Sequence, residues 1–116
     1  MAQKVPPRVE VQRDEKYQTI LVSGVFGGHR PGFFEAILYK DELVADEALS
    51  TAVPSPEKVY LRRTLQCRLV MDPFQAKNFA QWLIHHINEY EKLFGKIPTP
   101  EEVKQHSKGE GPSPYL

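Results

Sequence analysis

The strongest constraint on the fold is a long alternating segment that passes directly into a long helical one. In residues 58–71 the odd positions are apolar except Arg63 and the even positions are mostly polar. This period of two predicts a β-strand with one apolar face. Asp72 then suits a helix N-cap, proline suits the first helical position, and Gly95 suits the stop. The sequence therefore predicts a helix over residues 73–94 that follows the strand at once.

The apolar surface of this helix is wider than one sheet needs. At 100° per residue it spans an arc of roughly 200°, whereas roughly 100° covers a single sheet. The sheet-covering stripe comprises Ala76, Phe79, Ala80, Leu83, Ile87, Tyr90 and Phe94. A second stripe lies beside it and contains Trp82, His86 and Leu93, preceded by Gln75. We call Trp82, His86 and Leu93 the Trp82 stripe; Ile84 extends the opposite flank of the arc.

A second apolar stripe on one helix favours a second protein surface. We expect the Trp82 stripe and Ile84 to form an interface in a homodimer or with another subunit of a larger complex. The alternative is that Trp82 lies beneath the loop formed by residues 41–57 or beneath the C-terminal tail. These two arrangements differ in whether the chain associates.

The N-terminal half predicts a β-hairpin. Residues 16–26 are rich in β-branched and aromatic side chains, as strands are, and residues 9–12 alternate like a short edge strand. Residues 27–32 contain three glycines and a proline and predict a turn, after which residues 33–40 predict a second strand. The expected fold is α+β: an antiparallel sheet of three or four strands packed on one long C-terminal helix.

Proline positions suggest the domain boundaries. Six of the ten prolines lie near the two ends, which leaves a single α+β domain over residues 9–97. We expect residues 1–8 to be a flexible N-terminal segment. Residues 98–116 are expected to form a short helix, capped by Thr99 and ending near His106, followed by a disordered tail.

The helical half resembles a known family. The stretch Arg68-Leu-Val-Met-Asp-Pro-Phe-Gln-Ala-Lys77, followed by Leu83, Ile87, Tyr90-Glu91 and Phe94-Gly-Lys-Ile97, is similar to the prokaryotic domain-of-unknown-function family numbered 3467. The hairpin of residues 17–39 fits this family more loosely, since the family has a short polar turn where this chain has Gly27-Gly-His-Arg-Pro-Gly32. The resemblance implies a small α+β domain from a bacterium or archaeon and transfers no catalytic residue.

Composition excludes several classes of protein. Fifteen basic side chains balance fifteen acidic ones, which argues against wholesale electrostatic capture by nucleic acid or anionic lipid. No apolar run approaches the roughly 18 residues that cross a bilayer, and the N-terminus lacks the apolar stretch of a signal peptide. A lone cysteine, Cys67, excludes an internal disulfide. We therefore expect a cytoplasmic protein without a membrane partner.

Neither a catalytic nor a metal-binding set of residues can be assembled. His85 and His86 are adjacent on the predicted helix, so their side chains diverge by about 100°. His85 and Glu89 could form only half of a metal site, and Cys67 lies on the apolar strand face as a core residue. The sequence predicts no catalytic residue, no metal and no cofactor. It favours a non-catalytic interaction module over an enzyme.

A basic strip on the long strand provides the alternative function. Arg62, Arg68 and Tyr60 lie on its polar face with Thr64 and Gln66, and basic residues beside an aromatic one can hold single-stranded nucleic acid. His29 and Arg30 at the hairpin tip could add contacts to nucleic acid or to a protein partner. Cross-strand carboxylates such as Glu35 and Asp41 could instead neutralise the arginines.

Overall fold

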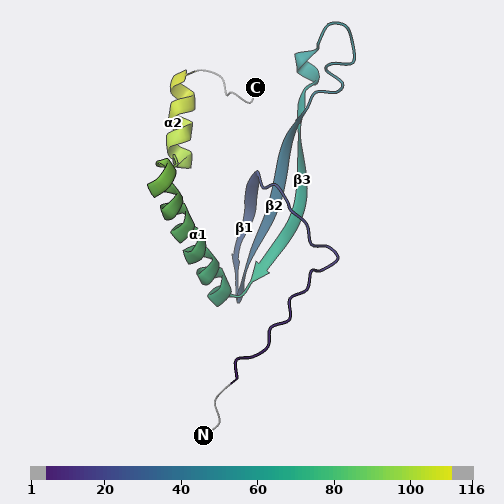
Figure 1. Ribbon diagram of the computed structural model, residues 1–116. Helices are drawn as coiled ribbons and strands as arrows, with labels where there is room; N and C mark the ends of the chain where they lie inside the picture. The colour runs from purple at the N-terminus through teal and green to yellow at the C-terminus, as the bar shows by residue number, and fades with distance from the viewer. Residues whose placement is uncertain (1–4, 111–116) are drawn as a thin grey trace. The chain divides into compact units, whose positions relative to one another are not determined.

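In the part of the chain that the structure describes, three strands and two α-helices form an α+β arrangement. The computed structural model describes residues 5–110, with side chains to residue 105. The elements are β1 (Gly24–Arg30), β2 (Phe33–Val44), the 3-10 turn η1 (Pro56–Lys58), β3 (Tyr60–Met71), α1 (Pro73–Phe94) and α2 (Pro100–Glu110) (Figure 1). The predicted α+β class, the antiparallel sheet and the long C-terminal helix are confirmed.

The elements belong to two compact units. One unit contains residues up to Arg30 together with Glu35–Val70, and so holds nearly all of the sheet. The other contains Pro31–Phe34 and the residues from Met71 onward, and so holds both helices. Each unit is described by itself below.

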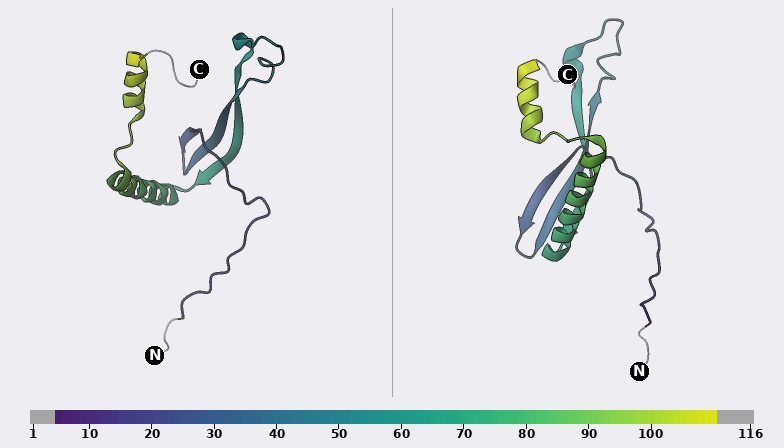
Figure 2. Two further views of the ribbon diagram at one scale, coloured as in Figure 1. Left: turned by 45° about the horizontal axis from the view of Figure 1, so that its top comes forward. Right: turned by 60° about the vertical axis from the view of Figure 1, so that its left-hand side comes forward.

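The sheet has three strands in the order β1-β2-β3 (Figures 1 and 2). β1 and β2 form the predicted hairpin, and its turn needs only Pro31 and Gly32. Proline pre-sets the bend, and Gly32 has a φ of +87°, a region that favours glycine. β1 has seven residues against twelve in β2, so part of β2 extends beyond it. β3, also twelve residues long, is the other edge of the sheet.

The first strand starts later than its composition suggests, which corrects two boundaries. The predicted strand 16–26 contributes only Gly24 onward, and four residues of the predicted turn, Gly27, Gly28, His29 and Arg30, lie in β1. Glycines occur inside β1 because neighbouring groups of the sheet lie very close to its backbone. A Cβ at Gly24 would lie 2.3 Å from the Tyr39 ring, and one at Gly27 would lie 2.3 Å from a backbone carbonyl of β2. These glycines let neighbouring groups approach the strand closely.

The segment before β1 has no strand partner. Residues 9–12 and 16–22 lie outside the sheet, so the expected edge strand at 9–12 is wrong. Tyr17 and Leu21 are 69% and 68% exposed. Strand propensity measures fit to a pleated, half-buried surface and does not by itself supply a partner strand.

Helix α1 begins and ends where the sequence predicts. Asp72 is the N-cap, and its Oδ1 accepts a hydrogen bond from the backbone N–H of Gln75 at 2.8 Å. At the other end Gly95 has a φ of +101°, and its N–H donates to the Glu91 carbonyl at 2.9 Å. The Glu91 side chain also accepts from the N–H of Ile97 at 2.8 Å. Both ends of the helix are therefore capped by local hydrogen bonds.

Helix α2 forms with the predicted cap and runs further than expected. Thr99 Oγ1 accepts from the N–H of Glu102 at 3.2 Å, and the Glu102 carboxylate accepts from the N–H of Thr99 at 3.3 Å. This reciprocal pair is a capping box. The helix continues to Glu110 and so passes the expected end at His106, because no proline intervenes before Pro112. The rest of the predicted tail, residues 111–116, lies outside the described residues.

The described chain buries very little apolar surface. Among residues 5–105, only two hydrophobic side chains are buried: Val44 at 9% exposure and Ala48 at 2%. Both lie near the connection from β2 to η1, where the N–H of Ser55 donates to the Ala48 carbonyl at 2.9 Å. Helix α1 has no buried residue. The elements are well formed, but neither unit has a core of ordinary size.

Candidate interaction surface

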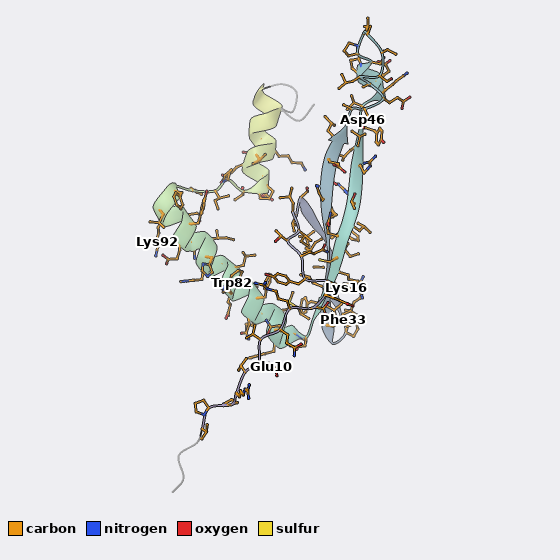
Figure 3. All side chains as sticks on the ribbon, turned by 45° about the vertical axis from the view of Figure 1, so that its right-hand side comes forward. Glu10, Lys16, Phe33, Asp46, Trp82 and Lys92 are labelled. Atoms are coloured by element: carbon orange, nitrogen blue, oxygen red, sulfur yellow. The ribbon has the colours of Figure 1, made fainter. Side chains whose placement is uncertain are left out.

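The apolar arc of α1 is present in the structure and is exposed. Because α1 is one unbroken helix, the spacing that defines the arc in the sequence also holds in space. Side chains surround the helix in Figure 3, where Trp82 and Lys92 are labelled. The exposed large apolar side chains of α1 are Phe74, Phe79, Trp82, Leu83, Ile84, Ile87, Tyr90, Leu93 and Phe94. An apolar set of this size on one helix is the feature that needs a covering surface.

The Trp82 stripe contains an ordered aromatic row. The rings of Trp82 and His86 have centroids 4.9 Å apart, and the Phe79 ring stacks on Trp82 from the other side at 5.8 Å. Trp82 is 55% exposed and Leu93 is 76% exposed. These residues are brought together by the spacings of three, four and seven along the helix. Phe79, Trp82 and His86 therefore form a row of adjacent rings, and Leu93 lies two turns further along the same side of the helix. The role of each residue at an interface stays a prediction.

Ile84 lies on the other flank of the arc and is 57% exposed. Between the two flanks lies the centre of the arc, at Leu83 and Ile87. A second aromatic pair, Tyr90 and Phe94, follows toward the end of the helix with centroids 4.9 Å apart. Apolar groups thus extend along the whole length of α1 as well as around half of its circumference.

The basic residues at one end of the sheet converge on a single carboxylate. Glu35 receives hydrogen bonds from Arg68, with Nε to Oε2 at 2.9 Å, and pairs with Arg30, with Nη2 to Oε1 at 2.9 Å. The three residues come from β2, β3 and β1, so the cluster links all the strands. The Glu35 side chain is 13% exposed. The hydrogen bond from Arg68 holds the pKa of the Glu35 carboxyl below its ordinary value, and the positive charges of Arg68 and Arg30 add to this.

A second cluster joins the strands further along the sheet. Arg63 donates two hydrogen bonds to Asp41, from Nε to Oδ1 at 2.8 Å and from Nη2 to Oδ2 at 2.9 Å. Its guanidinium lies 4.2 Å from the centroid of the Tyr39 ring. The Tyr39 ring occupies the space that Gly24 leaves open. The hydrogen bond from Arg63 lowers the pKa of the Asp41 carboxyl. Arg63, the exception on the apolar strand face, therefore has a structural partner in the sheet.

Arg62 also has a carboxylate partner within the sheet. Its guanidinium lies 3.7 Å from Glu42 and donates to the Tyr60 hydroxyl at 3.3 Å. At the hairpin tip, Arg30 donates to the His29 carbonyl at 2.9 Å as well as pairing with Glu35. Of the two carboxylates expected to neutralise this strip, Glu35 pairs with Arg68, whereas Asp41 pairs with Arg63 of the other strand face and Glu42 takes its place beside Arg62. Each of the four sheet arginines lies within 4 Å of a carboxylate, which lowers the net positive charge offered to a phosphate backbone.

The histidines of α1 do not meet a metal-binding set. Glu89, the partner considered for His85, pairs with Lys92 at 3.3 Å, and the His85 ring lies against His86 at 5.3 Å. Within the described part of the chain, no three His, Cys, Asp or Glu side chains come together in a way that could hold an ion. Cys67 is free and half-buried in β3. None of the described helices is sufficiently long and apolar to span a membrane.

Comparison with protein families gives a match over part of the chain. Residues 48–99 match the family described as "Protein of unknown function (DUF3467)". The chain is similar to this family over that range, which contains η1, β3 and α1. The predicted resemblance is confirmed there, and the match begins after β2, so the hairpin lies outside it. Searches of the curated proteins and of the solved structures gave no match.

Sequence reasoning missed several partners in these clusters. The sequence does not predict three of the pairs: Glu42 with Arg62, Phe79 with Trp82, and Arg30 with Glu35. The Phe79–Trp82 spacing of three was a visible signal, because residues three apart on a helix are neighbours. The Arg62–Glu42 and Arg30–Glu35 pairs carry no local signal, since they depend on the register between different strands.

Proposed function

We propose that this chain is a small non-catalytic interaction module that self-associates through the Trp82 stripe, with Ile84 completing the surface on the opposite flank. The observation that carries the proposal is the exposed apolar arc of α1. A helix with an arc of roughly 200° exceeds what one sheet covers. Whichever surface covers one side of the arc, the other side needs a second one, and a second copy of the chain is the simplest source.

The composition and geometry of the stripe support this proposal. Trp is among the residue types most enriched at interface hot spots, and its surroundings here are other rings held in place by helical spacing. The solvated side of α1 carries Lys77, His85, Asn88 and Glu89, so the helix has a clear boundary between its apolar and polar sides. Such a boundary is typical of a helix that is covered on one side.

Nucleic-acid binding through Arg62, Arg68, Tyr60, His29 and Arg30 is the competing function. The structure favours it less, because Glu35, Asp41 and Glu42 lie beside the arginines. A binder would show an affinity for oligonucleotides that falls steeply with salt, and Arg62→Ala would reduce the slope by about one.

The deciding experiment compares two adjacent histidines. Light scattering after size-exclusion chromatography is run on the wild type, Trp82→Ala, His86→Ala and the matched control His85→Ala. We expect a wild-type dimer that weakens in Trp82→Ala and His86→Ala and is unchanged in His85→Ala. A wild-type monomer at high concentration would refute self-association. Salt-sensitive oligonucleotide binding together with a monomer would favour the competing function.

A further inference from the structure

The segment that precedes β1 has the composition of a strand and no partner in its own chain. Residues 16–22 read Lys-Tyr-Gln-Thr-Ile-Leu-Val, without glycine or proline. Hydrogen bonds anchor its two ends: the N–H of Tyr17 donates to the Asp14 carbonyl at 2.9 Å, and the N–H of Ser23 donates to the Tyr39 carbonyl at 2.8 Å. Between them, residues 18–22 make no backbone hydrogen bond to the described part of the chain. A segment of strand-like composition with free backbone groups is suited to strand addition.

Within the described sheet, the outer edge of β3 also lacks a partner strand, so it could receive such a segment. β3 pairs only with β2, so along its twelve residues one side has no partner strand within the described sheet. The strand contains no proline. Its three arginines, which would otherwise discourage pairing at an edge, are held by carboxylates of β2. A long edge without these protections is a template for another strand.

The segment cannot reach the β3 edge of its own chain. A strand added outside β3 would lie three strand spacings from β1, about 14 Å at about 4.8 Å each. Only Ser23 separates the segment from β1, so Val22 stays beside β1. If residues 16–22 pair with the β3 edge, they must therefore belong to another copy of the chain.

Ser23 prevents residues 16–22 from continuing the hydrogen-bond ladder along β2 of their own chain. In a regular antiparallel ladder that starts from the Ser23–Tyr39 hydrogen bond, the N–H of Asp41 would donate to the carbonyl of Leu21. In the structure this N–H donates instead to Ser23 Oγ at 2.9 Å. A serine hydroxyl that captures a ladder N–H ends the pairing at that residue. The segment then leaves the sheet although β2 continues to Val44.

We propose that residues 16–22 of one copy add as a strand to the free edge of β3 in a second copy, and that the second copy returns the same contact. A second copy is the occupant because every copy carries both parts of the pair: a segment whose backbone groups lack partners among the described residues, and a β3 edge that this segment cannot reach in its own chain. The exchange would pair the backbone of both segments and cover Tyr17 and Leu21 in part. It deepens the proposed self-association, but it uses residues of the sheet unit and none of α1.

Hydrogen exchange on the full chain tests the proposal. Amide exchange is followed by mass spectrometry for the wild type, Ile20→Pro and the matched control Val11→Pro, at protein concentrations above and below the midpoint of association. In the wild type we expect exchange in residues 18–22 and in β3 to be at least tenfold slower at the high concentration. Ile20→Pro should lose this protection in both segments, since proline removes an N–H and restricts the backbone. Val11→Pro should keep it.

A second measurement keeps the result clear if Ile20→Pro is poorly folded. Cys67 lies in β3, so Leu21→Cys should form a covalent dimer with a short thiol-reactive cross-linker, whereas the wild type and Val11→Cys should not. Free exchange at residues 18–22 in a wild-type dimer would overturn the strand exchange and leave the role of α1 standing. Protection that does not depend on concentration would assign the segment to its own β2. A monomer without protection would overturn both proposals.

Discussion

Replacing Trp82 with alanine is the most direct perturbation of the proposed interface. An aromatic side chain offers up to about 250 Å² of surface. At 55% exposure, Trp82 has roughly 140 Å² left to bury on association. At about 25 cal/mol per Å², this burial stabilises the dimer by about 3.5 kcal/mol per copy. The value is an upper estimate, and a hot-spot loss of about 2 kcal/mol per copy sets the lower end.

Both copies lose the side chain, so the effect doubles in a two-fold dimer. The dissociation constant should rise between about 10³-fold and 10⁵-fold, since about 1.4 kcal/mol corresponds to a factor of ten. Sedimentation equilibrium over a wide concentration range measures this constant, and circular dichroism checks that α1 is still helical. The thermal midpoint of the wild type should also rise with protein concentration, as it does when folding and association are linked. A change below tenfold, or an equal change in His85→Ala, would refute the assignment of Trp82 to an interface.

Three further predictions concern the sheet and α1. Gly24→Ala should lower the free energy of unfolding by about 1–3 kcal/mol in urea titration, because its Cβ would lie 2.3 Å from the Tyr39 ring; adding Tyr39→Leu should recover most of the loss, and no recovery would contradict the steric account. Glu35 and Asp41 have lowered pKa values in the fold, so their contribution to stability is present above the ordinary carboxyl pKa and is lost as the pH falls through the lowered values. In urea titrations from pH 7 to pH 2, the free energy of unfolding should fall as the pH falls, and it should fall less steeply in Glu35→Gln. An equal dependence on pH in both proteins would argue against the Arg68 hydrogen bond. Asp72→Ala should cost about 1 kcal/mol and Asp72→Asn much less, because only alanine removes the acceptor for the N–H of Gln75; equal losses in urea titration would contradict the cap.

The sequence by itself determined the local structure of both helices. The limits of α1 follow from Asp72, Pro73 and Gly95, and the capping box of α2 follows from Thr99 and Glu102. These features depend on residues within a few positions of one another, so local spacing is sufficient to predict them. The apolar arc is of the same kind, because helical geometry fixes which residues share a face.

Only the tertiary structure decided which segments pair and how the charges are arranged. The stretch 16–22 has the composition of a strand, but the Ser23 hydroxyl takes the N–H of Asp41 and the strand begins at Gly24. Arg62 with Glu42, and Arg68 with Glu35, are far apart in the chain and meet through the register of β2 and β3. Strand pairing and cross-strand contacts join residues whose separation in sequence is arbitrary, so no local pattern specifies them.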